Sequence, residues 1–251
     1  MRTLKDFIKV KEKELSPKTM RMYRWTVKNI YDEDPEKVNR RIFSYLEEGK
    51  TAQARQCAVI VRNIYKFLGK NRDDVYLPAK KDRQIKAVDM GVVDKISENE
   101  KIPLEYRALI LLMANSGLRI SEALSLRVKD LDFENLEGRV ISKGKKEDEK
   151  RSDFVFTPRT STILKRITEK KDLNDYLFDL GDYNRVWRFF HNNFTFTPHQ
   201  LRHTFCTYYS KKLTPYQLQA LARHKSFQTT KRYIDPDLEN AKKSFREIKE
   251  D

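Results

Sequence analysis

The sequence predicts a mainly α-helical protein divided into two domains. Its 251 residues include only 7 glycines and 8 prolines, and the chain is rich in Lys, Glu and Leu, which favour helices. Apolar residues recur at spacings of three and four along most of the chain, as on the buried face of a helix. A polar, charged stretch at 71–87 separates two such regions and is typical of a linker. We therefore expect a helical N-terminal domain joined to a larger α-rich C-terminal domain that contains a small β-hairpin.

The N-terminal domain, residues 1–70, should contain four short helices. Ser16 can cap a helix whose first residue is Pro17, and Asp34 and Pro35 repeat this start signal before the third helix. Each of the four segments carries apolar residues at helical spacing, as the second helix shows with Met20, Tyr23, Val27 and Ile30. The four helices would share one apolar core.

The C-terminal domain, residues 88–236, should combine several helices with one β-hairpin. Two short β-like runs, RVIS and DFVF, flank a highly charged segment, which predicts a hairpin with a solvated tip. Helical periodicity marks segments on both sides of this hairpin. A last helix is expected over 237–251, where an apolar stripe crosses an otherwise charged segment: Leu238, Ala241, Phe245 and Ile248.

The charge of the chain points to a polyanionic partner. The net charge is +15 and the pI is about 9.6. Residues 1–86 hold 22 Lys and Arg against 12 Asp and Glu, whereas residues 87–251 hold 30 against 25, so the smaller region carries most of the excess. Two basic domains on a linker could close around double-stranded DNA as a clamp, which makes DNA the expected partner. The alternative is a basic protein whose lysines are merely solvated.

The same sequence disfavours several other classes of protein. The first residues lack the apolar run of a signal peptide and no apolar stretch could span a bilayer, so we expect a cytoplasmic protein without membrane contacts. Cys57 and Cys206 are the only cysteines, and they predict neither a disulfide framework nor a zinc motif. His199 and His203 have the spacing of a metal pair, but Gln200 stands where a zinc protease needs Glu. We therefore expect no metal and no cofactor.

Arg119 is a candidate for binding an anion. The preceding residues Asn115, Ser116 and Gly117 are typical of a turn, which would place Arg119 in the first turn of the next helix. Apolar neighbours can bury that helix while Arg119 points elsewhere, and its guanidinium offers a rigid fork of donors to a phosphate. The alternative is an ordinary surface arginine at the start of a helix.

Four segments, in chain order, carry a resemblance to a known family. GLRISEAL, ISKGKKEDEKR, PHQLRHTFCT and ARHKSFQTTKRYI are similar in content and spacing to the motifs of tyrosine recombinases of the integrase family. Xer-type recombinases and archaeal mobile-element integrases are the most similar kinds. The resemblance covers residues 88–236, and it is looser over 1–87, where S-P-K-T-x-x-x-Y resembles the start of a core-binding domain. It implies a two-domain DNA clamp made of a core-binding and a catalytic domain.

The resemblance implies four residues that meet the scissile phosphate. Arg119 and Arg202 would hold its non-bridging oxygens, and His224 would hydrogen-bond a phosphate oxygen. Tyr233 would attack the phosphorus and form a 3′-phosphotyrosyl bond. Arginines and imidazoles can stabilise the negative charge that gathers on the equatorial oxygens without a metal ion. The covalent bond would conserve the energy of the phosphodiester, so rejoining would need no ATP.

The remaining roles that the resemblance implies concern proton transfer and support. Lys143 would be the general acid that protonates the leaving 5′-oxygen, with Lys145 and Lys146 as alternatives in the same run. His199 would assist proton transfer at the nucleophile. Four further residues would support these groups: Glu122 would orient Arg119, and Thr229, Thr230 and Arg232 would position the segment of Tyr233. Apart from the resemblance, we expect His203 to support Arg202 or to cap its helix.

Two positions depart from the family's motifs. Arg223 stands where the family usually has glycine before the motif histidine, and we expect it to add a phosphate contact or to change the loop. Asp235 and Pro236 follow the tyrosine, where the family often has a second histidine. Neither departure removes a catalytic group.

The expected function is site-specific DNA recombination without metal or ATP. The resemblance implies that protomers pair on inverted DNA arms, that four copies assemble through residues 237–251, and that strands exchange through a Holliday junction. The alternatives are a type IB topoisomerase-like enzyme, a non-catalytic DNA-binding accessory protein and a DNA-bending architectural protein. The sequence leaves open the target site, and it does not separate dimer resolution from integration of an element.

Overall fold

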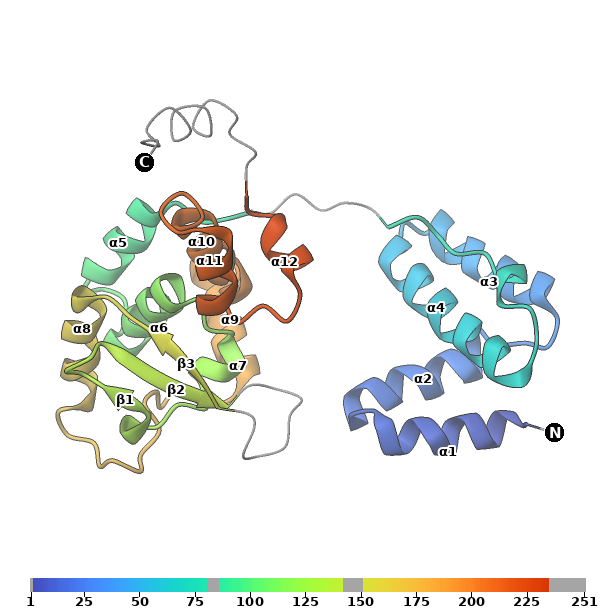
Figure 1. The fold of residues 1–251 in the computed structure, drawn as a ribbon, viewed down its shortest axis with the longest axis horizontal. Helices are drawn as coiled ribbons and strands as arrows, with labels where there is room; N and C mark the ends of the chain where they lie inside the picture. Colours follow the sequence, from blue (N-terminus) through green and yellow to red (C-terminus); the bar gives the residue numbers. More distant parts are fainter. Residues whose placement is uncertain (1, 81–85, 142–150, 235–251) are drawn as a thin grey trace, which may run out of the picture. The chain divides into compact units, whose positions relative to one another are not determined.

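The computed structural model describes residues 2–80, 86–141 and 151–234, and it divides into two compact units, Met1–Arg83 and Gln84–Asp251 (Figure 1). The described chain is mainly helical and contains one three-stranded antiparallel sheet, as the sequence predicted. Within these ranges no helix has the length and apolar character that a membrane crossing requires.

The first unit is built from four helices. The bounds of the helices are α1 Leu4–Glu14, α2 Pro17–Asn29, α3 Pro35–Glu47 and α4 Thr51–Leu68. The predicted caps of α2 and α3 are confirmed, because Ser16 accepts from the backbone N–H of Thr19 and Asp34 from that of Glu36. The longest helix, α4, contributes much of the buried apolar surface, through residues such as Cys57, Ala58, Val61 and Ile64.

The start of the segment expected to be the linker packs onto the first unit. A 3₁₀ turn at Arg72–Asp74 leads to Val75, which is fully buried in the core of this unit. Asn39 on α3 holds the strand-like chain beside it by donating to the carbonyl of Asp74 and accepting from the N–H of Tyr76. The sequence did not predict this packing, because one buried valine among charged residues gives no periodic signal.

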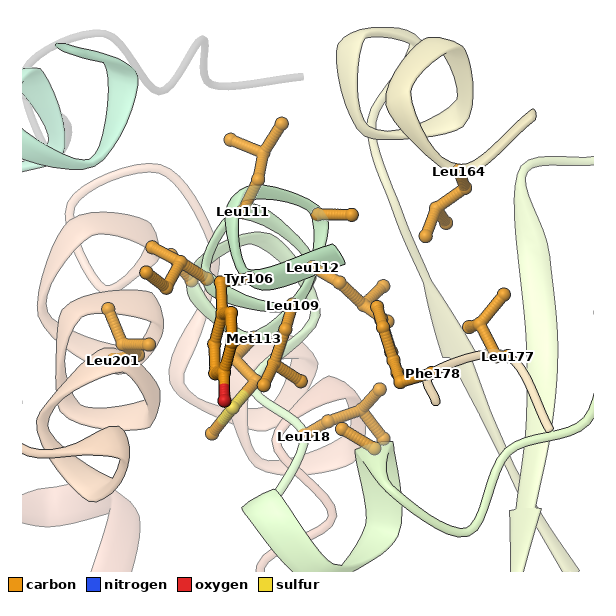
Figure 2. Packing of buried hydrophobic residues seen from close by; sticks show 14 of the residues in the cluster. Tyr106, Leu109, Leu111, Leu112, Met113, Leu118, Leu164, Leu177, Phe178 and Leu201 are labelled. Carbon is orange, nitrogen blue, oxygen red and sulfur yellow. The ribbon is translucent and has the colours of Figure 1, made fainter. Parts of the chain in front are cut away.

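The second unit surrounds one buried helix, α6. Its elements are α5 Met90–Glu98, α6 Leu104–Ser116, α7 Ile120–Ala123, a 3₁₀ turn at Val128–Asp130, β1 Leu131–Asp132, β2 Glu137–Ile141, β3 Arg151–Val155, α8 Pro158–Thr168, α9 Tyr183–Asn193, α10 Pro198–Tyr209, α11 Pro215–Leu221 and α12 Phe227–Lys231. Side chains on several sides of α6 are buried, and the helix packs against α5, α8 and α10. Figure 2 shows Leu109, Leu112 and Met113 of α6 among apolar side chains from other segments. Of the residues that the sequence analysis singled out, Arg119 follows the end of this central helix, Arg202 lies on α10, His224 follows α11 and Tyr233 follows α12.

The predicted β-hairpin is confirmed as the antiparallel pair β2–β3. Its register places Glu137 opposite Val155 and Ile141 opposite Arg151. A third strand, β1, pairs with β2 through Leu131 and was not predicted, because two residues are too few to show alternation. Lys143, the residue expected to be the general acid, lies outside the described residues.

Candidate active site

The turn between α6 and α7 brings Arg119 close to α10. Asn115 and Ser116 are the last residues of α6, so the expectation that they form a turn was wrong, and the turn begins at Gly117. Gly117 has a φ of 63°, in the left-handed region, and a Cβ there would lie 2.5 Å from Cδ1 of Phe205. Glycine therefore permits both the backbone conformation and the close approach of this turn to α10.

Arg119 is the N-cap residue of α7, and Glu122 fixes its position. The Glu122 carboxylate accepts from the backbone N–H of Arg119 at 2.9 Å and from its Nη1 at 2.6 Å. The Glu122 side chain is 4% exposed, whereas that of Arg119 is 41% exposed. One edge of the guanidinium is thus held by a buried carboxylate, which leaves other donors of the fork accessible to an anion.

Arg202 links the α6–α7 turn to the end of α11. This residue of α10 is 4% exposed. Its Nη1 donates to the carbonyl of Gly117, in the α6–α7 turn, and its Nη2 donates to the carbonyl of Ala222 at 2.5 Å. Burial, followed by the charge of Arg119, lowers the pKa of Arg202. A guanidinium can serve both carbonyls because its donors diverge in one plane, so Arg202 brings the segments around Arg119 and His224 together.

His224 is fixed by hydrogen bonds to neighbouring segments. Its Nδ1 lies 2.9 Å from Oγ1 of Thr230, and its backbone N–H donates to the carbonyl of Gln219. Burial, followed by the positive charges of Arg202 and Arg119, lowers the pKa of His224 to about 4. The imidazole is therefore neutral near pH 7, and Thr230 links it to the short helix that precedes Tyr233.

Tyr233 lies in the turn after α12, with its hydroxyl against α10. Its Oη lies 2.5 Å from Nδ1 of His203. The tyrosine ring stacks on His224, with ring centroids 6.0 Å apart and planes 15° from parallel. It also packs against a small buried cluster that contains Phe205 and Cys206. The predicted nucleophile is thus held beside both imidazoles and near the buried Arg202.

The surroundings of Tyr233 keep its proton in place. Burial, followed by the neighbouring Cys206 thiol, raises the pKa of Tyr233 to about 12, although Arg202 and Arg232 act in the opposite direction. Burial, followed by His199, lowers the pKa of His203 to about 4. Near neutral pH both groups are uncharged, so the short contact joins a protonated phenol and a neutral imidazole.

The remaining predicted residues occupy different places around this group. His199 lies one turn before His203, is exposed on one side, and meets the His203 ring with centroids 4.6 Å apart; partial burial lowers its pKa. His203 was expected to support Arg202 or to cap its helix, and its contact with Tyr233 was not predicted. That contact spans 30 residues, and no local pattern indicates it. Thr229 is exposed on α12, and Arg232 is the C-cap residue of that helix.

Arg223 was expected to add a phosphate contact or to change the loop, and its side chain points inward instead. Its side chain is 6% exposed, and Nη2 lies 3.6 Å from Oε2 of Glu122. Among the described residues, no group of three or more His, Cys, Asp or Glu side chains is placed to hold a metal ion. The site includes Arg119, Arg202, the neutral imidazoles of His203 and His224, and the Tyr233 hydroxyl.

Comparison with known proteins identifies relatives of this chain. A family profile described as the phage integrase family matches residues 90–240. The tyrosine recombinase XerA of Saccharolobus solfataricus is 29% identical over 254 residues, which cover 90% of this chain and 85% of the relative. The TnP I resolvase of Bacillus thuringiensis is 26% identical over 77% of each chain.

Two solved structures show the same fold at low sequence identity. The Tn1549 transposon integrase in complex with circular intermediate DNA has a TM-score of 0.71 and 18% identity, over 92% of this chain and 94% of that one. A lambda integrase tetramer bound to a Holliday junction has a TM-score of 0.71 and 16% identity, over 92% of this chain and 76% of that one.

Proposed function

Because this chain belongs to the phage integrase family and is a tyrosine recombinase, an enzyme of site-specific DNA recombination, we propose that Tyr233 is the nucleophile that cuts and rejoins the DNA. The observation that carries this assignment is the position of the Tyr233 hydroxyl, 2.5 Å from a neutral imidazole and beside the element that holds Arg202. Residues 1–70 would be the core-binding domain and residues 88–236 the catalytic domain.

Cleavage would pass through a covalent bond between Tyr233 and the DNA. The Tyr233 oxygen would bond to phosphorus as the bond from phosphorus to the 5′-oxygen breaks. The phenolic proton would pass to Nδ1 of His203, and Lys143 would give a proton to the leaving 5′-oxygen. The reverse transfers would rejoin the strand, and no external energy source is needed because a phosphodiester is exchanged for another phosphoester.

His203 is a better candidate than His199 for accepting the phenolic proton in this arrangement. Its Nδ1 is within hydrogen-bond distance of the hydroxyl, as a general base must be. His199 is exposed one helical turn away, where it could instead bind the phosphate or share the proton through the His203 ring. A negative phosphate beside these rings would raise their basicity as cleavage begins.

The two arginines and His224 would stabilise the charge that develops on the phosphate. Arg119 offers donors that remain accessible, and Arg202 supplies a buried charge that solvent screens little. Glu122 would orient Arg119, and Thr230 would orient His224. Donors of this kind act without a divalent ion, so cleavage should survive removal of metals.

The proposal is tested with nicked duplexes that trap the covalent species. We would incubate the native chain, in EDTA, with a pool of nicked duplexes whose random-sequence arms flank the nick. Cleavage beside the nick releases a short fragment, and its loss blocks rejoining. The expected result is an SDS-resistant protein–DNA adduct enriched in one arm sequence. No adduct from the pool would contradict the proposal, and relaxation of supercoiled plasmid without site preference would favour the topoisomerase-like alternative.

We also propose that the enzyme assembles on DNA as a dimer and then as a tetramer through residues 237–251, which lie outside the described residues. The apolar stripe of that segment suits a protein contact. Deleting residues 237–251 should leave binding of a single arm unchanged and abolish paired complexes, as gel shift on one-arm and two-arm duplexes would show. Paired complexes and strand exchange at native levels after the deletion would refute this contact.

A further inference from the structure

Arg223 adopts a backbone conformation that its surroundings must maintain. Its φ is 54°, in the left-handed region that side chains other than glycine rarely occupy. Its backbone N–H donates to the carbonyl of Ala220 at 2.9 Å, and its Nη1 donates to the carbonyl of Leu221 at 2.9 Å. An arginine in such a position indicates that its side chain makes contacts which offset the strain.

The side chain of Arg223 reaches from the loop before His224 to the end of α6. Both Nη atoms lie 3.5 Å from the carbonyl oxygen of Ser116, and Nη2 lies 3.6 Å from Oε2 of Glu122. The side chain is 6% exposed, so it lies behind Glu122 and away from the surface that a DNA backbone could reach. Arg223 therefore contacts the same carboxylate as Arg119, from the interior side.

Glu122 lies between two guanidinium groups, those of Arg119 and Arg223. Glu122 meets Arg119 through Oε1 at 2.6 Å and Arg223 through Oε2 at 3.6 Å. A buried carboxylate paired with Arg119 alone would offset much of the positive charge that Arg119 presents to an anion. The second guanidinium balances the carboxylate from within, and it does so in a buried setting where solvent screens little.

We propose that Arg223 is a positioning residue for DNA cleavage, which holds Glu122 against the α6–α7 turn and leaves the charge of Arg119 available to the scissile phosphate. This inference rests on the proposed function of Tyr233. Arg223 touches neither the nucleophile nor the expected path of the DNA, so it would act on cleavage through Glu122. Loss of Arg223 should therefore lower the rate of the chemical step, with little change in the affinity for DNA.

The test compares Arg223→Met with Arg223→Lys. Both side chains are unbranched, similar in length and subject to the same backbone strain, so the pair differs mainly in charge. On the duplex selected from the pool, at saturating protein, Arg223→Met should lower the single-turnover rate of adduct formation about 10-fold to 100-fold. Arg223→Lys should recover much of that rate. DNA affinity, measured in a Tyr233→Phe background, should stay at the native value for both.

Two further variants separate positioning from stability. Lys225→Met removes an exposed positive charge from the same loop and should not slow cleavage at saturation. In a Glu122→Gln background, Arg223→Met should cost less than it does in the native chain, because the carboxylate that it balances is gone. A native cleavage rate in Arg223→Met overturns the inference. The inference is also overturned if Arg223→Met and Arg223→Lys lose the same cleavage rate and both lower the melting temperature by the same amount. A native chain that forms no adduct refutes the proposed function instead, so the two failures are distinguishable.

Discussion

Replacing Tyr233 by phenylalanine is expected to abolish the covalent protein–DNA adduct and to leave DNA binding unchanged. The substitution removes only the hydroxyl, and the remaining ring can still stack on His224 and pack against Phe205. The structure places the Tyr233 hydroxyl oxygen 2.5 Å from Nδ1 of the His203 imidazole. We expect adduct formation to fall below detection, by at least about 10⁴-fold in rate, because without a nucleophile the remaining groups have no bond to form.

The matched control for Tyr233→Phe is Tyr216→Phe. Tyr216 belongs to the same unit, is 77% exposed and packs its ring against Phe227 of α12. The control should form adduct at the native rate, measured on SDS gels with end-labelled duplex. An adduct that persists in Tyr233→Phe would place the nucleophile elsewhere and would refute the mechanism.

Replacing Arg202 by lysine is expected to reduce both cleavage and stability strongly. The guanidinium donates to carbonyls of two separate segments, at Gly117 and Ala222, and a single ammonium group cannot reproduce that fork. Breaking these buried contacts should lower the free energy of unfolding by about 3 kcal/mol. The cleavage rate should fall by roughly 10³-fold, since the buried positive charge would be displaced and the segments that carry Arg119 and His224 would lose their shared anchor.

Urea denaturation and single-turnover cleavage would measure the two effects of Arg202→Lys separately. Arg166→Lys, an exchange at an exposed position of α8, should change the free energy of unfolding by less than about 0.5 kcal/mol. If both substitutions changed the free energy of unfolding equally, the hydrogen bonds of the Arg202 guanidinium would contribute nothing to stability, which would contradict this prediction. Partial recovery of cleavage at low temperature, where Arg202→Lys is fully folded, would divide the loss between stability and chemistry.

Much of the fold could be predicted because its signals are local. The Ser-Pro and Asp-Pro pairs that begin α2 and α3 combine a capping oxygen with a residue whose φ suits a first turn. The β2–β3 hairpin was visible as two short β-like runs around a charged tip. The short strand β1 and the packing of Val75 were missed, because each depends on partners that are distant in the sequence.

The sequence indicated candidate residues of the site but not the contacts between them. The order and spacing of the motifs indicated Arg119, Arg202, His224 and Tyr233, and the structure places them on neighbouring segments of the second unit. The partner of the Tyr233 hydroxyl could not be predicted, because His199 and His203 differ only by one turn of the same helix. The direction of Arg223 was equally hidden, since it depends on a left-handed backbone and on a carboxylate far along the chain.

Identifying the amino acid in the adduct shows whether Tyr233 carries the DNA strand. We would digest the trapped adduct of the native chain with nuclease and trypsin, and sequence the nucleotide-bearing peptide by tandem mass spectrometry. We expect a 3′-nucleotide on Tyr233, within the peptide that spans residues 233–242. A nucleotide attached to any other residue would contradict it.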